Sequence, residues 1–380
     1  MKVVFVEKSI PDYRTRVFVL LHDYLKEEGI DFELVAGQMS GKEQLNEYFP
    51  EGDWVTRINN TYLYKDIHYA RVGDALKGAD MVILHPMNSA LILYKILMDR
   101  YLFSGPKVGF FGHGGNMNIL YDPAHPPLRE RMKNKIAKLP DWWFPYTEMS
   151  RQRIVDLQLA YPEEQMTVVN NAIDTSIFLE GTAAVTEAQK QAIRDELAIP
   201  ENAPLGLYCG RLMATKITFL EDVLKQVKSA IPDFHMVIIG KGNETPGLLE
   251  FAGSVDWVHA VGPKYHEARY PYFVASDVFI NPGYVGLSIL DAFASGLPFY
   301  TTHCNIHSPE VVYLRNGENG YMTEDNAKAL SEQVIDTLKK PELLAHLAEN
   351  AINTAKVTNM EAMAANFVRG IKQCLGLSKP

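Results

Sequence analysis

Residues 205–230 read LGLYCGRLMATKITFLEDVLKQVKSA, and this stretch sets the fold class. The apolar run at 205–209 has the length of a buried strand, and the amphipathic stretch 218–230 has helical spacing. A second apolar run follows at 235–239. Strand, helix and strand in this order are typical of a βαβ unit, in which a helix connects two parallel strands.

The same alternation runs through the rest of the chain. In the first half, the predicted strands are 3–6, 32–36, 81–84, 107–111, 142–145 and 166–169, and the predicted helices are 17–28 and 89–101. In the second half, further strands are predicted at 257–260, 278–281 and 298–301, and helices at 287–295, 327–337 and 341–355. We therefore predict two successive α/β domains, each a Rossmann-like, doubly wound sheet covered by helices on both faces.

The boundary between the two domains falls where the pattern restarts. We predict an N-terminal domain at 1–172, a connecting helical segment at 173–203 that is rich in Ala, Glu, Gln and Lys, and a second domain at 204–358. A C-terminal helix at 359–380 is expected to pack back on the N-terminal domain. Doubly wound sheets bind ligands beyond the carboxyl ends of their strands, so two facing sheets would place a site in a central cleft.

Composition excludes several classes of protein. The 380 residues carry 37 Lys and Arg against 46 Asp and Glu, and a net charge of −9 disfavours nucleic-acid binding. The three cysteines (Cys209, Cys304 and Cys374) form no CxxC pair, so neither a disulfide framework nor a zinc knuckle is indicated. No apolar run reaches the length of a signal-peptide core or a membrane span, which predicts a cytoplasmic protein.

The loop after 205–209 carries a pattern suited to an anion. Gly210, Arg211 and Lys216 lie where a strand opens into a loop and then a helix. Free N–H groups at a helix start and two cations in one place favour a phosphate. The alternative is an exposed Arg and Lys on an ordinary loop between a strand and a helix.

A second motif, NPGYVGLSILDA at 281–292, joins a strand to a helix through two glycines. The N–H groups of such a loop can cradle a phosphate. Asp291 lies one turn into the predicted helix, where a carboxylate can accept two hydrogen bonds from a ribose diol. The alternative is that Asp291 only interacts with the positive end of the helix.

Seven blocks of the second half, kept in order and spacing, resemble the retaining GT-B-fold glycosyltransferases of family 4, which use nucleotide-sugar donors. The blocks are VNNAIDTSIF (169–178), YCGRLMATK (208–216), VIIGKG (237–242), VHAVG (258–262), SDVFINP (276–282), GLSILDAFASGLP (286–298) and PEVV with NGY (309–321). The N-terminal half matches this family in pattern only.

The resemblance implies a set of nucleotide-sugar-binding residues. Arg211 and Lys216 should hold the donor diphosphate, and Asp291 should bind the ribose as the second acid of the family's E-x7-E motif. The first acid should fall at Gly283, so this chain departs from the family there, which puts the pose of the donor sugar in doubt. The other residues implied are Gly210, Gly240, Lys241, Gly262, Tyr284, Val285, Gly286, Leu287 and Ser288.

Candidate residues in the first domain are fewer. His113 follows the predicted strand 107–111 in a glycine-rich loop, and family members carry a histidine near the donor sugar at a comparable place; the alternative is a structural loop histidine. Asn116 of the same loop, Glu148 and Arg14 are weaker candidates on the acceptor side. For Arg14, a position on a solvated helix face is an equally good explanation. For Glu148, the alternative is that its neighbours Thr147 or Ser150 only cap the following helix.

Together these features predict a retaining, hexosyltransferase-like enzyme without a cofactor or metal, with Arg211, Lys216 and His113 as its catalytic residues. The acceptor is expected to be a glycan or a lipid-linked glycan of a cell-surface polysaccharide. His303 and His307 lack a third ligand, and a solvated loop is the better interpretation of them. A GT-B-fold nucleotide-sugar epimerase and a non-catalytic nucleotide-binding homologue remain alternatives, the latter because of Gly283.

The stretch 128–143 has the pattern of a helix lying in a lipid interface. Leu128, Met132, Ile136 and Leu139 recur at helical spacing, cations flank them, and Trp142 and Trp143 follow. Cations would meet headgroups and the tryptophans the membrane boundary, which predicts weak contact with the inner face of a membrane. The alternative is an amphipathic helix packed on the sheet, with both tryptophans in the core.

Overall fold

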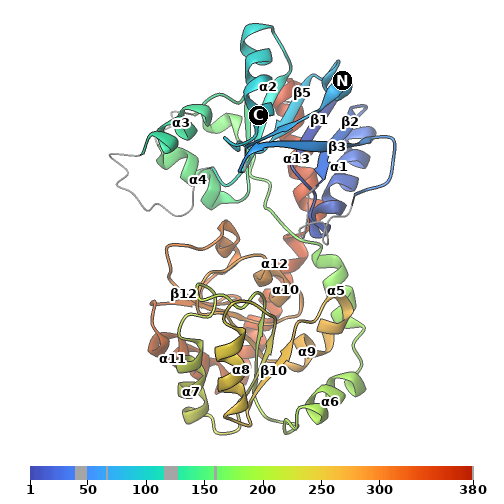
Figure 1. The fold of residues 1–380 in the computed structure, drawn as a ribbon. Helices are drawn as coiled ribbons and strands as arrows, with labels where there is room; N and C mark the ends of the chain where they lie inside the picture. The colour runs from blue at the N-terminus through green and yellow to red at the C-terminus, as the bar shows by residue number, and fades with distance from the viewer. Residues whose placement is uncertain (39–48, 66, 115–126, 158–160, 379–380) are drawn as a thin grey trace. The chain divides into compact units, whose positions relative to one another are not determined.

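The computed structural model describes residues 1–38, 49–65, 67–114, 127–157 and 161–378. The chain forms two compact units (Figure 1). Unit 1 comprises Met1–Ile173 and Met360–Pro380, and unit 2 comprises Asp174–Asn359. The C-terminal helix therefore belongs to unit 1, together with the N-terminal residues, as the sequence predicted. The segment 173–203, predicted as a connection, contains the helices α5 (Thr175–Ala183) and α6 (Glu187–Glu196), which are part of unit 2.

Among the described residues, the sheet of unit 1 has seven strands in the order β4-β3-β2-β1-β5-β6-β7. All neighbouring strands are parallel except β3 and β4, which are antiparallel. The strands are β1 (Lys2–Glu7), β2 (Asp31–Gln38), β3 (Val55–Tyr64), β4 (Ile67–Ala70), β5 (Met81–Leu84), β6 (Lys107–Gly112) and β7 (Trp142–Pro145). The central strands are apolar because helices cover both of their faces.

Alternate residues of these strands enter two cores. Val3 and Phe5 pack with helices α1 (Thr15–Glu27) and α13 (Met360–Leu375) on one face. Val4 and Val6 pack with residues of the other face. The helices on that second face are α2 (Leu91–Leu102), α3 (Leu128–Ile136) and α4 (Glu148–Asp156).

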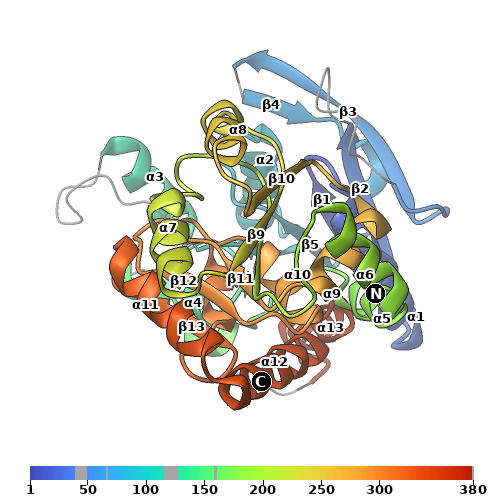
Figure 2. The same ribbon diagram turned by 90° about the horizontal axis from the view of Figure 1, so that it is seen from below.

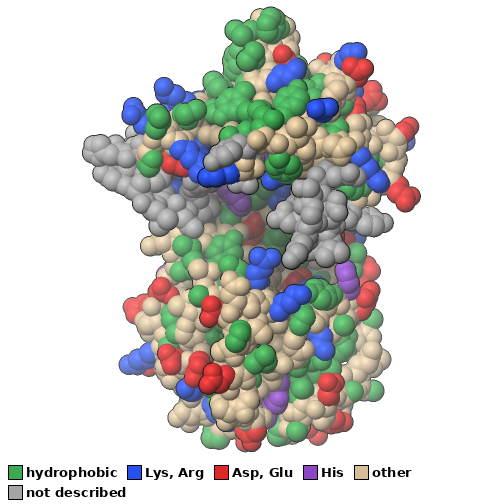
Figure 3. Space-filling view, in the orientation of Figure 1, with side chains coloured by type: hydrophobic (Ala, Val, Ile, Leu, Met, Phe, Trp, Pro, Cys, Tyr) green, Lys and Arg blue, Asp and Glu red, His purple; other side chains and the backbone are tan. Residues whose placement is uncertain are grey.

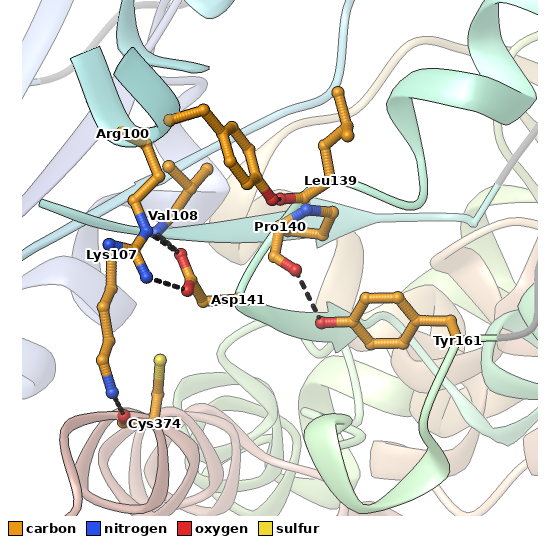
Figure 4. A network of polar contacts seen from close by, with 9 residues as sticks. Arg100, Lys107, Val108, Leu139, Pro140, Asp141, Tyr161 and Cys374 are labelled. Carbon is orange, nitrogen blue, oxygen red and sulfur yellow. Dashed lines mark hydrogen bonds and ion pairs between the residues drawn. The ribbon is translucent and has the colours of Figure 1, made fainter. Parts of the chain in front are cut away.

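Polar contacts cluster at the amino-terminal ends of β6 and β7, and one of them ties α13 into unit 1 (Figure 4). Lys107 donates a hydrogen bond to the carbonyl of Cys374 on α13. Asp141 accepts from Arg100 Nε at 2.8 Å and from the Val108 N–H at 2.8 Å. The last helix of the chain is thus held by side chains of a strand more than half the sequence away.

Three sequence expectations in unit 1 need correction. The segment 166–169 is not a strand, because Met166 makes only an isolated bridge with Trp143. Strands β3 and β4 were not predicted, since their polar sequences lack a continuous apolar run. Trp142 and Trp143 lie in β7 with 5% and 1% of their surface exposed, so they are core residues and do not mark a membrane boundary.

The described sheet of unit 2 has six parallel strands in the order β10-β9-β8-β11-β12-β13. They are β8 (Leu205–Cys209), β9 (His235–Ile239), β10 (Val258–Gly262), β11 (Val278–Ile280), β12 (Phe299–Thr302) and β13 (Gly320–Thr323). Helices α7 (Leu220–Ala230) and α11 (Ala327–Leu338) contact each other over one face, where their apolar residues form one core with those of the strands (Figure 2).

The remaining helices of unit 2 include α8 (Thr245–Gly253), α9 (Tyr270–Ala275), α10 (Ser288–Ala294) and α12 (Pro341–Val357). Helix α10 contacts both α5 and α12. Short 3₁₀ turns precede α9 and follow β12; they are η5 (His266–Arg269) and η6 (Pro309–Tyr313).

Each sheet has a topological switch point. In unit 2 the chain runs outward from β8 to β9 on one side and to β11 on the other, and in unit 1 β1 lies in the same way between β2 and β5. Open α/β sheets bind ligands at the carboxyl ends of the strands that flank such a point. Ligand sites are therefore expected at the carboxyl ends of β8 and β11 and at those of β1 and β5.

Candidate functional site

The two predicted motifs of unit 2 meet at its switch point. The Tyr284 N–H, after β11, donates a hydrogen bond of 2.6 Å to the carbonyl of Thr215, after β8. A Cβ built on Gly283 would lie 2.2 Å from the same oxygen, closer than any real Cβ contact. The position that holds an acid in the family's motif must be glycine here, because the backbone of the Arg211–Lys216 loop fills the space of its side chain.

Two cations stand beside this glycine loop. Lys216 is half-buried, with its Nζ 5.4 Å from the centre of the Tyr284 ring, and Arg211 is exposed. Burial lowers the pKa of Lys216, and the nearby Arg211 lowers it further. Neither cation has an acidic partner in the part of the chain that the structure describes. Two adjacent uncompensated positive charges favour binding of an anion.

The loop also offers backbone donors. The N–H groups of Gly286, Leu287 and Ser288 have no hydrogen-bond acceptor within the described ranges. A Cβ on Gly286 would lie 3.8 Å from Lys216 Nζ, which places these donors beside the lysine. Backbone donors and cations thus lie in the same small region, an arrangement that phosphate-binding loops also have.

A buried histidine fixes the loop. The Val285 N–H donates to His307 Nδ1 at 3.1 Å, and His307 Nε2 lies 2.8 Å from the Thr302 carbonyl, to which it must donate. Burial lowers the pKa of His307, in agreement with this neutral tautomer. The sequence interpretation of a solvated pair was wrong for His307, which is 7% exposed, whereas His303 is exposed. The Val285 side chain is buried, so it supports the loop from below.

Asp291 has a partner that the sequence analysis missed. Arg269, at the end of η5, donates to Asp291 Oδ2 at 2.9 Å. Burial raises the pKa of the Asp291 carboxyl, and Arg269 opposes that rise. The ring of Phe178 lies 5.0 Å below the guanidinium. Asp291 lies in the first turn of α10, the helix in which the sequence placed it, and one of its carboxylate oxygens forms an ion pair with Arg269.

The remaining predicted residues of unit 2 line the neighbouring strand ends. A Cβ on Gly240 would lie 1.9 Å from the Gly210 carbonyl oxygen, and its φ of +151° suits glycine. The Gly240 N–H in turn donates to the Gly262 carbonyl at 3.0 Å. Gly240 thus lets the ends of β8 and β9 approach closely, and Lys241 is exposed beside it.

The switch point of unit 1 holds a cluster of paired groups. Glu7 ends β1 and His85 follows β5, with 3.1 Å between Glu7 Oε1 and His85 Nε2. Arg14 Nη2 donates to the Tyr146 hydroxyl at 2.7 Å, and Arg14 Nη1 lies 3.9 Å from Glu7. Burial alone would lower the pKa of Arg14, but Tyr146 and Glu7 raise it. The solvated setting considered for Arg14 is therefore wrong.

The other predicted residues of unit 1 are more peripheral. His113 is exposed after β6, with its ring 4.3 Å from that of Tyr146, so it adjoins the Arg14 cluster. Glu148 begins α4 and accepts from Arg151 Nε at 2.7 Å on an exposed helix face. Asn116 lies outside the described residues. Glu7, His85 and Tyr146 were missed, since no local motif marks them.

Neither a metal-binding cluster nor a membrane-spanning helix is found among the described residues. Within the described ranges, no three His, Cys, Asp or Glu side chains gather into a group that would hold a metal ion. Over those same residues, no helix combines the length and the apolar character needed to cross a membrane.

Known proteins share parts of this architecture. Residues 203–340 match the family model of the glycosyl transferases group 1. No protein with a curated function matches the sequence. Among solved structures, HepE of Anabaena in complex with UDP superposes with a TM-score of 0.67 at 13% identity, covering 98% of this chain and 100% of that one.

Two other structures extend this picture. A glycosyltransferase from Rickettsia africae gives a TM-score of 0.71 at 15% identity, covering 99% of each chain. The UDP-GlcNAc 2-epimerase of Neisseria meningitidis gives 0.65 at 17% identity, covering 98% of this chain and 100% of that one. Identities this low establish the fold alone. The predicted GT-B fold is confirmed, and the match to the family model of the glycosyl transferases group 1 lies within the second unit.

Proposed function

We propose that the protein is a retaining, metal-independent glycosyltransferase of the family 4 type. It transfers a sugar from a nucleotide-diphosphate sugar to a glycan or lipid-linked glycan of a cell-surface polysaccharide. One observation carries the proposal: Arg211, Lys216 and three unpartnered backbone N–H groups converge at the switch point of unit 2. That arrangement fits a diphosphate, because its negative charge would balance the two cations and its oxygens would accept hydrogen bonds from the N–H groups.

The same groups suit the chemistry of transfer. As the bond between the anomeric carbon and the diphosphate breaks, negative charge grows on the leaving oxygen. Arg211, Lys216 and the N–H groups of 286–288 stabilise that charge, which is the role a divalent ion plays elsewhere. The acceptor oxygen forms the new bond on the face that the diphosphate leaves, and its proton passes to a donor phosphate oxygen. Asp291 binds the ribose diol through the oxygen that Arg269 does not hold.

The structural relatives suggest the first donor to test. HepE has been captured with UDP, with UDP and glucose, and with UDP-glucose. WaaG, which superposes with a TM-score of 0.60 at 15% identity, covers 96% of this chain and 99% of its own, and it is a glycosyltransferase involved in lipopolysaccharide biosynthesis. These relatives support a uridine nucleotide and a polysaccharide product.

We further propose that the enzyme works in the cytoplasm, peripheral to the membrane that carries its acceptor. On α3, Leu128 and Met132 are 72% and 47% exposed, and Arg131, Lys135 and Lys138 are exposed near them. The end of α2 adds apolar surface, and Figure 3 shows apolar side chains gathered over this part of unit 1. The exposed residues there are Met98, Tyr101, Leu102 and Phe103.

A thermal-shift screen with UDP, GDP, ADP and their sugars tests the proposal. A ligand that binds only the folded state, present at a hundred times its Kd, stabilises the protein by about 2.7 kcal/mol. We expect UDP and one UDP-sugar to raise the melting temperature and the other nucleotides to do so less. No shift with any nucleotide or nucleotide sugar would overturn the proposal.

The competing function is that of a nucleotide-sugar epimerase, because one of the similar structures is a UDP-GlcNAc 2-epimerase. NMR of the protein with the stabilising donor alone separates the two. An epimerase converts the donor to a new sugar isomer without an acceptor, whereas a transferase leaves the donor intact or slowly hydrolyses it. Tight nucleotide binding with no consumption of donor in the presence of any acceptor would instead identify a non-catalytic homologue.

A further inference from the structure

We infer that His307 is a positioning residue for the nucleotide site of unit 2, a role that rests on the proposed function. Its imidazole holds the backbone of Val285, in the loop between β11 and α10. That contact determines which way the loop presents its next N–H group, the one of Gly286. His307 therefore acts on a bound diphosphate through the backbone that it orients.

Val285 is held on both sides by two consecutive residues. Its N–H donates to His307 Nδ1 at 3.1 Å, and its carbonyl accepts from the Ser308 N–H at 3.1 Å. A trans peptide group is planar, and its C=O and N–H point in opposite directions. Because the Val285 carbonyl faces Ser308, the Gly286 N–H of the same peptide group faces away from Ser308. There it has no backbone acceptor within the part of the chain that the structure describes.

The peptide group before Val285 is fixed in the same way. Its carbonyl, that of Tyr284, accepts from Asn281 Nδ2 at 3.2 Å, and its N–H is the one that His307 holds. Tyr284 also connects this loop to the loop that carries both cations, because its N–H donates to the Thr215 carbonyl at 2.6 Å. A buried N–H that loses its acceptor is unfavourable, so without His307 this peptide group turns toward a new partner. The phosphate-binding groups of the two loops then lose their fixed positions.

The surroundings of the imidazole make Nδ1 an acceptor. Nε2 lies 2.8 Å from the Thr302 carbonyl, which can only accept, so Nε2 carries the proton and Nδ1 keeps a lone pair. The Cys304 N–H, 3.4 Å from Nε2, is the weaker contact. The Cys304 thiol lies 3.4 Å from both ring nitrogens, and burial raises its pKa, so it stays protonated. Burial lowers the pKa of His307, which favours the neutral ring that the contact with Val285 requires.

Two substitutions separate the two hydrogen bonds of the ring. The side-chain oxygen of Asn is attached to Cγ, as Nδ1 is in His, so His307→Asn keeps an acceptor for the Val285 N–H. The amide nitrogen of Gln reaches the place of Nε2, so His307→Gln keeps the donor to the Thr302 carbonyl and leaves the Val285 N–H without a partner. Each variant loses one hydrogen bond, but only one of them releases the loop.

Isothermal titration calorimetry with UDP, together with thermal unfolding of each nucleotide-free variant, tests the inference. We expect His307→Asn to bind UDP nearly as wild type does and His307→Gln to bind it about three- to tenfold more weakly. The melting temperatures of both variants should fall by similar amounts, so a purely structural role does not predict the difference in affinity. His346→Gln, the same substitution at an exposed histidine of α12, should bind UDP as wild type does.

Amide hydrogen exchange in the wild-type protein gives a second test, which decides even if His307→Gln fails to fold. Without nucleotide, the Val285 N–H should exchange slowly because it is bonded to a buried imidazole. The Gly286 N–H should exchange fast, and UDP should slow its exchange, because the diphosphate supplies the missing acceptor.

Either of two results would overturn the inference. One is that His307→Asn and His307→Gln bind UDP equally well, which would leave the proposed function intact. The other is that the Val285 N–H exchanges as fast as that of Gly286 in the nucleotide-free wild-type protein. If no nucleotide binds the wild-type protein, it is the proposed function that fails, whatever the exchange rate of Val285.

Discussion

The two switch points of this molecule use the same backbone plan with opposite electrostatics. In unit 2, Arg211 and Lys216 have no acidic partner among the described residues, and loop N–H groups add further donors. In unit 1, Glu7 and Arg14 lie 3.9 Å apart, and His85 and Tyr146 complete their hydrogen bonds. The strand ends of unit 2 therefore carry unpaired positive charge, whereas Glu7 and Arg14 at the strand ends of unit 1 offset each other.

The difference teaches how a repeated fold acquires two roles. Topology decides where a ligand binds, because strand ends diverge at the switch point in both sheets. Side chains decide what binds there, because the charges of unit 2 lack acidic partners among the described residues whereas those of unit 1 are paired.

Removing a cation from unit 2 should have the largest effect on nucleotide binding. Arg211→Ala and Lys216→Ala each lose a charge-assisted contact worth about 1.5–3 kcal/mol. The Kd for UDP, measured by isothermal titration calorimetry, should therefore rise about ten- to a hundredfold. Lys225→Ala, in which an exposed lysine of α7 is changed, is the matched control. If both site variants bind UDP with wild-type affinity, the Arg211–Lys216 loop is not the diphosphate-binding site.

Gly283 and Gly286, in the loop between β11 and α10, should respond differently to a methyl group. Gly283→Ala places its Cβ 2.2 Å from the Thr215 carbonyl and should cost about 1–3 kcal/mol of unfolding free energy. Gly286→Ala places its Cβ no closer than 3.6 Å to any neighbour and should leave stability nearly unchanged. Urea denaturation measures both. Equal stability of the two variants would mean that the loops do not pack as described.

The ion pair of unit 2 should give a pH-dependent stability. Arg269→Gln leaves the Asp291 carboxylate partly buried without its cation and should destabilise the fold by about 1–2 kcal/mol at pH 8, because side chains 24% and 15% exposed retain some solvation. Burial already raises the Asp291 pKa, and losing Arg269 raises it further. The deficit is complete above that pKa and shrinks as Asp291 takes up a proton, so it should be smaller at pH 5.

Thermal unfolding at the two pH values, compared with wild type, measures this effect. The double variant Arg269→Gln, Asp291→Asn removes the titrating group, so its deficit should be equal at pH 5 and pH 8. A single variant with the same deficit at both values would show that the ion pair does not hold Asp291 in its charged form.

The smallest effect concerns the surface of unit 1. Cosedimentation with anionic vesicles should show weak adsorption that is lost at high salt, with at most about 1 kcal/mol per basic residue. Changing Arg131, Lys135 and Lys138 to Ser should abolish it. The control changes the same number of exposed lysines in unit 2: Lys225, Lys328 and Lys340. Absence of binding at low salt would favour a soluble acceptor.

Local sequence determined much of this protein. Apolar runs such as 81–84 and 142–145 became strands β5 and β7, because a fully buried strand must be continuously apolar. Glycines beside cations marked the Arg211–Lys216 loop, since that pattern lies within a few residues. Two such series in succession predicted two α/β domains, and the resemblance of seven sequence blocks to a known family implied the GT-B fold.

Tertiary structure decided the partners that lie far apart in the chain. Arg269 reaches Asp291 across 22 positions, Glu7 meets His85 across 78, and Arg14 meets Tyr146 across 132. No local pattern encodes these pairs, because strand order and register, not sequence distance, bring their side chains together. Whether a charge is free to bind a ligand or already paired depends on those contacts, so only the folded chain separates the cations of unit 2, which have no acidic partner among the described residues, from the paired charges of unit 1.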